Sequence, residues 1–233
     1  MEQFYTPPRL VTPPSLTIEG DEFNHLNRVM RLGPGDAVRV ADGAGNMYEA
    51  VIASVSRLAA TCTIASHSSR VHEPSREVTL GIGVLKNPAR FDFLVEKATE
   101  LGVYAIVPLL TERTIPRSAK IDRWQHLCLA AMKQSERCVL PEVRHLTTFD
   151  EFLASAPKDG DRFIAHEKST VPLPFPGESA NASAIMCVGP EGGFSDAEIE
   201  RAENAGFTSV ALGPRRLRTE TAALKLLALT LHD

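Results

Sequence analysis

Two glycine loops in the last third of the sequence constrain the fold more than any other feature. The first loop spans Val188–Asp196 and follows the apolar run Ala184–Val188, which predicts a buried strand. The second spans Leu212–Thr221 and follows a short strand predicted at Val210–Leu212, and a helix is expected over Thr221–Leu231. Two such junctions, so close in sequence, should bring two sets of backbone amides to one edge of a sheet. A ligand at the carboxyl ends of the strands would meet both loops.

From Val78 onward strands and helices alternate, which predicts an α/β fold with a mostly parallel sheet covered on both faces. The other expected strands and helices of this region are the strands Val78–Leu85, Ala105–Leu110 and Arg162–His166 and the helices that begin at Asn87-Pro88, Asp122 and Phe149. The first of these helices ends at Gly102, and its buried stripe should be Phe91, Leu94, Ala98 and Leu101. After the first glycine loop, Ser195 or Asp196 can cap the next helix, and Glu198 completes a capping box with Ser195.

The first seventy residues predict an all-β unit instead. The expected strands are spaced as in a small barrel, at Ala37–Ala41, Tyr48–Val55 and Ala60–Ala65. A helix is expected before them, over Asp21–Arg31, with Phe23, Leu26 and Met30 on its buried face. The polar segment His67–Arg76 breaks the periodicity and predicts a linker, so two domains are expected, 1–72 and 73–233.

Charge narrows the class of protein. The net charge is −4, so binding to nucleic acid would need a local basic patch. Arg28 and Arg31, three residues apart on the predicted helix, could grip phosphates, and Arg9 is a third candidate. The alternative interpretation is a solvated helix face.

Membrane, secreted and metal-binding classes are disfavoured. The longest apolar runs, Val103–Leu110 and Leu224–Leu231, are too short to span a bilayer, and the polar, proline-rich start does not resemble a secretory signal. The four cysteines are scattered, which is typical of a reduced cytoplasmic protein. His67 and His72 could be metal ligands, but no other ligand pair has suitable spacing, and exposed linker histidines are the alternative.

The chemistry concentrates in the second glycine loop. Glycines permit close backbone approach, but by themselves they also fit a tight structural turn, and no phosphate-loop lysine follows. Arg215, Arg216, Arg218 and Glu220 crowd together beside Gly213, between an apolar strand and an apolar helix. A cluster of cations at such a junction suits an anionic partner or a developing negative charge.

The residues of the two loops carry a resemblance. Val188–Ser195 followed by Leu212–Ala222 resembles the paired signature of the SPOUT, or α/β-knot, methyltransferases. More narrowly, it is similar to the bacterial RsmE family, which methylates uridine N3 in 16S ribosomal RNA. Further matches extend over nearly the whole chain, at His25–Arg31, Lys97–Val103, Pro108, Thr111–Arg113 and Gln134–Arg137. One departure is Gln3, which stands where the family often has an arginine before the aromatic pair Phe4-Tyr5.

The resemblance implies a C-terminal trefoil-knotted domain that binds S-adenosylmethionine and an N-terminal PUA-like β-barrel that binds RNA. No metal is implied, because the sulfonium already activates the methyl group. The implied cofactor-binding residues are Val188, Gly189, Pro190, Glu191, Gly192, Gly193, Leu212, Gly213, Arg216, Leu217, Arg218, Thr221 and Ala222. The implied partner is 16S ribosomal RNA in the small ribosomal subunit, in the cytoplasm, with RNA contacts at Arg9, Arg28, Arg31 and Arg113.

The implied reaction requires that uracil N3–H, a weak acid, lose its proton. Arg218 is expected to stabilise the uracil anion through its carbonyl oxygens, and Glu220 to orient that arginine or accept the proton. Gln134 and Arg137 would help to place the base or its phosphate. For Glu220, the alternative is a helix-start carboxylate that interacts with the helix dipole.

Two further expectations concern assembly and function. The final helix is apolar nearly all round, so we expect a homodimer with its core at Thr221–Leu231. The alternative function is a non-catalytic RNA- or nucleotide-binding module that uses the same loops to hold its ligand.

Overall fold

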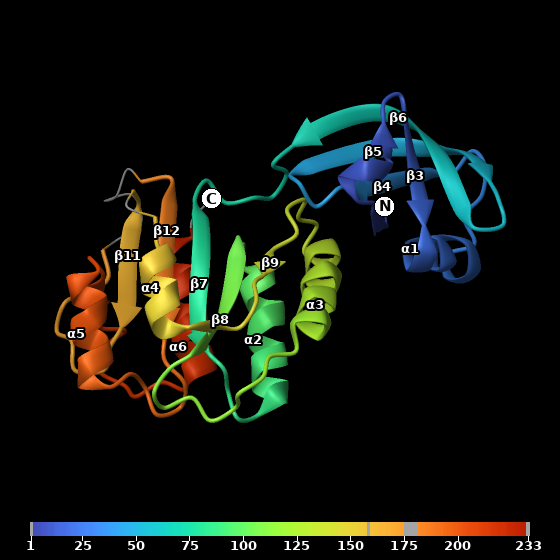
Figure 1. Cartoon of the computed structure of the whole chain (residues 1–233). Coiled ribbons are helices and arrows are strands. Elements are labelled where there is room, and N and C mark those ends of the chain that lie inside the picture. Colours follow the sequence, from blue (N-terminus) through green and yellow to red (C-terminus); the bar gives the residue numbers. More distant parts are fainter. Residues whose placement is uncertain (1, 158, 175–180, 232–233) are drawn as a thin grey trace. The chain divides into compact units, whose positions relative to one another are not determined.

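The structure is a computed structural model that describes residues 2–157, 159–174 and 181–231 (Figure 1). The chain forms two compact units. The first contains the residues up to Glu73 together with Leu129–Leu140, and the second contains Pro74–Cys128 and the residues from Pro141 onward.

The first unit is built on one six-stranded sheet. Its strands are β1 (Gln3–Tyr5), β2 (Val11–Thr12), β3 (Ser15–Glu19), β4 (Ala37–Ala41), β5 (Asn46–Val55) and β6 (Ala59–Ser69), in the order β1-β4-β5-β6-β3-β2. β1 pairs with β4 in parallel, and the other pairs are antiparallel. Among the described residues the two end strands, β1 and β2, do not pair with each other, so the sheet does not close into a hydrogen-bonded barrel. The three predicted strands are confirmed.

The core of the first unit is apolar and fully enclosed. Alternate residues of the strands point into it, including Phe4, Leu16, Ile18, Val40 and Ile52, all at most 1% exposed. A short 3-10 helix, η1 (Pro8–Leu10), precedes β2.

The predicted helix of the first unit is shorter and more irregular than expected. It consists of α1 (Gly20–Asn24) and a π-helical turn, η2 (His25–Val29). Phe23 and Leu26 are buried as predicted, but the prediction for Met30 is wrong, since it lies beyond the helix and is 39% exposed. Arg31 also lies beyond the helix, in a left-handed conformation with φ 58°. Arg28 and Arg31 are therefore not neighbours on one helix face.

The predicted linker begins too early. β6 continues through Ser69, because Ser66–Ser69 pair with Asn46–Glu49 of β5. Beyond it, the Glu73 carboxylate accepts hydrogen bonds from the Arg137 guanidinium at 2.7 Å and from the backbone N–H groups of Cys138 and Val139, each at 2.8 Å. This buried pair fixes the segment Leu129–Leu140 within the first unit.

The second unit is a parallel sheet with helices on both faces, as predicted. Its strands are β7 (Glu77–Gly83), β8 (Ala105–Leu110), β9 (Glu142–Val143), β10 (Thr147–Thr148), β11 (Asp161–Ala165), β12 (Ser183–Val188) and β13 (Thr208–Val210). The order is β10-β8-β7-β12-β11-β13, with β9 beside β8, and every pair is parallel. The helices are α2 (Pro88–Glu100), α3 (Ile121–Gln134), α4 (Phe149–Ser155), α5 (Asp196–Asn204) and α6 (Thr219–Thr230). From Leu129 on, the residues of α3 belong to the first unit.

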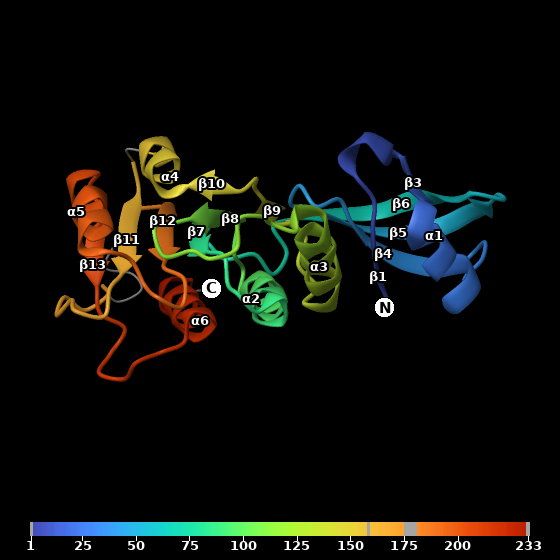
Figure 2. The same cartoon turned by 60° about the horizontal axis from the view of Figure 1, so that its bottom comes forward.

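The helices cover the two faces of this sheet in pairs. Figure 2 shows α2 and α6 side by side on one face and α4 and α5 on the other. Phe149 and Phe152 of α4 and Ile199 of α5 share one apolar cluster with the strand residues Val107 and Ile164. Such a doubly covered parallel sheet leaves its carboxyl edge for ligands.

Local signals explain where the helices begin. The Asn87 side chain accepts a hydrogen bond from the Ala89 N–H at 3.0 Å and Pro88 occupies the first turn of α2. The capping box at Ser195 and Glu198 is confirmed. One predicted core residue is wrong: Leu101, at the end of α2, is 38% exposed.

Candidate active site

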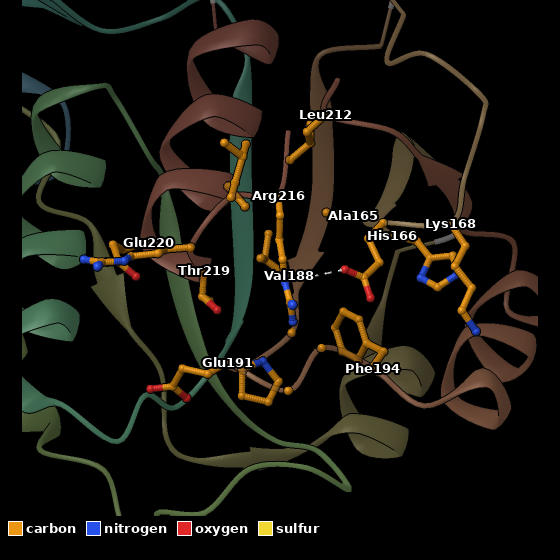
Figure 3. Close-up of a pocket in the computed structure, with 18 of the residues that line it drawn as sticks. Ala165, His166, Lys168, Val188, Glu191, Phe194, Leu212, Arg216, Thr219 and Glu220 are labelled. Carbon is orange, nitrogen blue, oxygen red and sulfur yellow. Dashed lines mark ion pairs between the residues drawn. The ribbon is translucent and has the colours of Figure 1, made fainter. Parts of the chain in front are cut away.

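A cavity of about 790 Å³ opens at the carboxyl edge of the parallel sheet of the second unit (Figure 3). Three adjacent strands, β12, β11 and β13, end there, and their loops supply most of its lining. Such a volume is typical of sites for small molecules and cofactors. The lining residues come from the two glycine loops, from the end of β11 and the segment after it, from the first turns of α2 and α6, and from Arg113 after β8.

The first glycine loop is a tight turn pressed against the neighbouring strand. The Gly193 N–H donates to the Pro190 carbonyl at 2.8 Å, and Gly193 has φ +68°, in the region that favours glycine. At Gly83, at the end of β7, a Cβ atom would lie 2.4 Å from the Pro190 nitrogen. The two backbones therefore approach too closely for any side chain at that position.

A neighbouring loop braces the first glycine loop. We call Thr111–Lys120, between β8 and α3, the β8–α3 loop. The carboxylate of Glu198, a residue that is 1% exposed, accepts from the backbone N–H groups of Ser195 and Glu112, both at 2.8 Å. The Arg113 guanidinium donates to the Gly192 carbonyl at 2.7 Å. Through these bonds the cofactor loop predicted from the sequence has a fixed support.

The second glycine loop keeps its backbone donors free. Within the described residues, none of the N–H groups of Leu212, Gly213, Arg215, Arg216 and Leu217 forms a hydrogen bond. The loop is held instead through a carbonyl, because the Lys225 ammonium donates to the Leu212 oxygen at 2.8 Å. A run of unpaired donors beside a cavity suits a ligand with several acceptor atoms.

The charged side chains around the cavity form pairs of different strength. Glu220, on the first turn of α6, is 8% exposed and faces Arg90 of α2 at 3.8 Å. The pair of Arg216 and Glu167 joins the second glycine loop to the segment after β11 at 4.0 Å, with both side chains largely exposed (Figure 3). Lys168 binds Asp196 at 2.7 Å and thereby lowers the pKa of that carboxyl.

Arg218 occupies the N-cap position of α6. Its side chain makes no capping bond and, among the described residues, no hydrogen bond or ion pair, and it is exposed at the cavity. The expectation that Glu220 orients Arg218 finds no contact in support, since the described partner of Glu220 is Arg90.

The predicted cofactor residues are brought together with one exception. All of them line the cavity except Thr221, which is exposed on α6. The residues that sequence reasoning missed are Arg90 and the segment Ala165–Lys168. The predicted strand Arg162–His166 was a usable signal, because its carboxyl end must reach the same edge of the sheet as the glycine loops.

The other predicted residues lie elsewhere in the chain. Gln134 and Arg137 belong to the first unit, where Gln134 is exposed. The Arg137 side chain is 3% exposed and bound to Glu73, which gives it a structural role there. In the same unit Arg9 pairs with Glu19 at 3.1 Å, and Arg28 and Arg31 are exposed.

The described residues hold neither a metal-binding cluster nor a membrane-spanning helix. No group of three or more histidine, cysteine, aspartate or glutamate side chains is arranged to hold a metal ion within the described ranges. In the same part of the chain, every helix is too short or too polar to cross a membrane.

Comparison with known proteins defines the class of this one. Residues 72–231 match the family described as RNA methyltransferase domain, and residues 18–65 match the family described as RNA methyltransferase PUA domain. The chain is therefore an RNA methyltransferase with a PUA domain.

The similar relatives narrow the class further. A ribosomal RNA small subunit methyltransferase E from Synechocystis is 34% identical over 95% of this chain and 74% of its own length, and one from Bacillus subtilis is 28% identical over 92% and 89%. A crystal structure of a ribosomal RNA small subunit methyltransferase E from Neisseria gonorrhoeae, bound to S-adenosylmethionine, superimposes with a TM-score of 0.86 and 32% identity, covering 98% of this chain and 95% of that one. The chain belongs to the ribosomal RNA small subunit methyltransferase E family.

Proposed function

We propose that this protein transfers the methyl group of S-adenosylmethionine to N3 of a uridine in 16S ribosomal RNA of the small ribosomal subunit. The proposal depends on one observation: both glycine loops, Arg218 and Glu220 line the same cavity at one edge of the sheet. The Neisseria relative, and a putative methyltransferase from Legionella pneumophila with 29% identity and a TM-score of 0.81, are both described with bound S-adenosylmethionine.

The residues of the cavity fit this cofactor. The free N–H groups of the second glycine loop match the many acceptor atoms of a nucleoside and an amino-acid carboxylate. In the first loop, a Cβ atom at Gly193 would meet nothing within 4 Å, so a ligand has room to approach the backbone there. We propose that the cofactor is bound by Val188–Gly193, Leu212–Leu217 and the first turn of α6. When bound, the cofactor supplies a methyl group that its sulfonium has already activated, so that no metal is required.

The protein's own contribution to the reaction concerns the uracil. One bond forms, between the methyl carbon and N3, one carbon–sulfur bond breaks, and the N3 proton leaves. We assign to Arg218 the stabilisation of the negative charge that develops on the uracil carbonyl oxygens, because a guanidinium presents paired donors. Glu220 is the candidate acceptor of the proton or the group that fixes the neighbouring arginines.

The remaining parts of the proposal concern domains and assembly. We assign RNA binding to the first domain, 1–72, through Arg9, Arg28 and Arg31, and catalysis to the domain 73–233, with the final segment threaded into a trefoil knot. Gln134 is proposed to help place the base. We further propose a homodimer that acts in the cytoplasm, where ribosomal subunits are found.

The decisive experiment is methyl transfer by the purified protein. Small ribosomal subunits from cells that lack the protein are incubated with it and S-adenosylmethionine, and the nucleosides of the 16S RNA are analysed by mass spectrometry. We expect 3-methyluridine to appear. In calorimetry on the protein alone, a chelator should leave the affinity for the cofactor unchanged. Cofactor binding without any transfer would support the alternative, a non-catalytic RNA- or nucleotide-binding module.

A further inference from the structure

The β8–α3 loop carries a concentration of positive charge, of which only Arg113 is bonded at the first glycine loop. It contains three cations, Arg113, Arg117 and Lys120, and one carboxylate, Glu112, in a chain whose net charge is −4. Arg113 is occupied at the cofactor loop through its bond to the Gly192 carbonyl. Arg117 and Lys120 are exposed, and their side chains form no hydrogen bond or ion pair with any residue that the structure describes.

Helix stability does not explain these cations. Lys120 immediately precedes α3, and its carbonyl accepts the Trp124 N–H at 3.0 Å, so this cationic residue lies at the positive end of the helix. The helix dipole disfavours a cation at that end. An anion bound near Lys120 would interact favourably with both the lysine and the positive end of the helix.

The base of the loop is rigid, whereas the rest is presented to solvent. Thr111 and Thr114 are 4% and 2% exposed, and their hydroxyl groups bond to each other at 2.9 Å. The buried Glu198 holds the Glu112 N–H. Beyond this anchored base, Ile115 is 61% exposed between the cations. A loop that is fixed at its base loses little conformational freedom when it binds a partner.

The position of the loop relates it to the cavity. It leaves the carboxyl end of β8, on the same edge of the sheet as the glycine loops, and its residue Arg113 is part of the cavity lining. In Figure 1 the loops that follow β7, β8 and β11 gather along this edge. A polyanion whose reacting group enters the cavity would therefore pass this loop.

We propose that Arg117 and Lys120 bind phosphate groups of the RNA next to the nucleotide that enters the cavity, with Ile115 against a neighbouring sugar or unpaired base. The inference rests on the proposed function, because it takes RNA as the substrate of the adjoining site. RNA fits better than an acidic protein surface, since regularly spaced phosphates match two separated, exposed cations without a defined pocket. Arg113 has a different role, which is to tie this contact surface to the cofactor loop.

The test uses single charge reversals in the full-length protein. Arg117→Glu and Lys120→Glu are compared with the control Arg144→Glu. Arg144 is half-buried, pairs with Glu142 at 2.9 Å, and donates its backbone N–H to the Ile106 carbonyl near the opposite end of β8. Binding of a short fluorescein-labelled, uridine-rich RNA is titrated over a range of salt concentrations. Log affinity falls as log salt rises, and each reversal in the loop should make this slope less steep by about 1. The control should leave the slope unchanged.

The kinetic arm uses small ribosomal subunits from cells that lack the protein. We expect KM for the subunits to rise about tenfold in each loop variant, with the affinity for S-adenosylmethionine in calorimetry as in the unchanged protein. A salt slope equal to that of the unchanged protein in both loop variants would overturn the inference. Failure of the unchanged protein to methylate the subunits would instead overturn the proposed function, and the two failures are distinguishable because the salt slope does not depend on turnover.

Discussion

At the scale of single residues, Arg218 is the strongest candidate for direct participation in the reaction. A cation at the N-cap of α6 opposes the helix dipole and makes no capping bond, so the structure gives it no stabilising role. We expect Arg218→Ala to lower kcat by about a hundredfold, equivalent to about 3 kcal/mol, because a charged donor to the developing anion is lost. Single-turnover kinetics on small subunits measure this, and calorimetry should show nearly unchanged cofactor affinity. Arg218→Lys, which keeps the charge but not the paired donors, should fall in between.

Glu220 either accepts the N3 proton or positions a neighbouring arginine. Its contact with Arg90 allows a double-mutant cycle to distinguish the two roles. If Glu220 accepts the proton, Glu220→Gln should abolish turnover whether or not Arg90 is present. If Glu220 instead acts by holding Arg90 in place, Arg90→Ala and Glu220→Gln should each lower kcat about tenfold. The double variant should then be no slower than either single variant. We expect the second result, because the pair lies between the first turns of two helices at 3.8 Å. Strictly multiplicative losses would contradict it.

At the scale of elements, the first glycine loop depends on the absence of a side chain at Gly192. A Cβ atom there would lie 3.2 Å from the Arg113 Cβ and 3.3 Å from its Cδ, so a larger residue must displace the arginine that holds the loop. Gly192→Val should therefore weaken S-adenosylmethionine binding by about tenfold or more in calorimetry. The matched control is Gly33→Ala, where a Cβ would meet nothing within 4 Å. Normal affinity in the valine variant would reduce Gly192 to an ordinary turn residue.

The elements themselves were largely predictable from the sequence, because periodicity and capping are local. Ala37–Ala41 and Ala105–Leu110 were predicted with the bounds that the structure has, and Ser195 with Glu198 identified the start of α5. The errors occur where the local sequence pattern does not determine the backbone conformation. Met30 continues the helical spacing of its segment, but the π-helical turn shifts the register and leaves it in solvent.

The two glycine loops of the site were predictable from the sequence, but the residues that line the cavity beside them were not. Chain order revealed that β12 and β13 each end in a glycine loop, whereas the position of β11 between them follows from sheet order, which no local pattern encodes. His166 and Lys168 were missed for that reason. Likewise, the motif around Gln134 and Arg137 gave no sign that Arg137 is held by the distant Glu73.

At the scale of the whole molecule, the structure changes how the expected homodimer must be tested. The apolar surface of α6 is mostly used within the chain: Leu226 and Leu227 are fully buried, and α6 packs against α2. Leu227→Asp, the obvious choice from the sequence, would place a charge in the core and cost on the order of 4 kcal/mol of folding free energy. Within the described residues of these two helices, the exposed large apolar side chains are Leu229 of α6, at 39% exposure, and Phe93 of α2, at 47%.

We therefore expect Leu229→Asp and Phe93→Asp to shift a dimer towards monomers in sedimentation velocity while the circular dichroism spectrum stays that of the folded protein. The two helices lie side by side on one sheet face (Figure 2), and each exposes an apolar side chain that a second copy can cover by two-fold symmetry. Arg218 is the N-cap of α6 and Glu220 lies in its first turn, so loss of the partner should also lower turnover on small subunits. Leu58→Asp, at a residue of the first unit that is 75% exposed, is the control and should leave both the sedimentation coefficient and turnover unchanged. A folded, fully active monomer in either variant would remove the dimer from the mechanism.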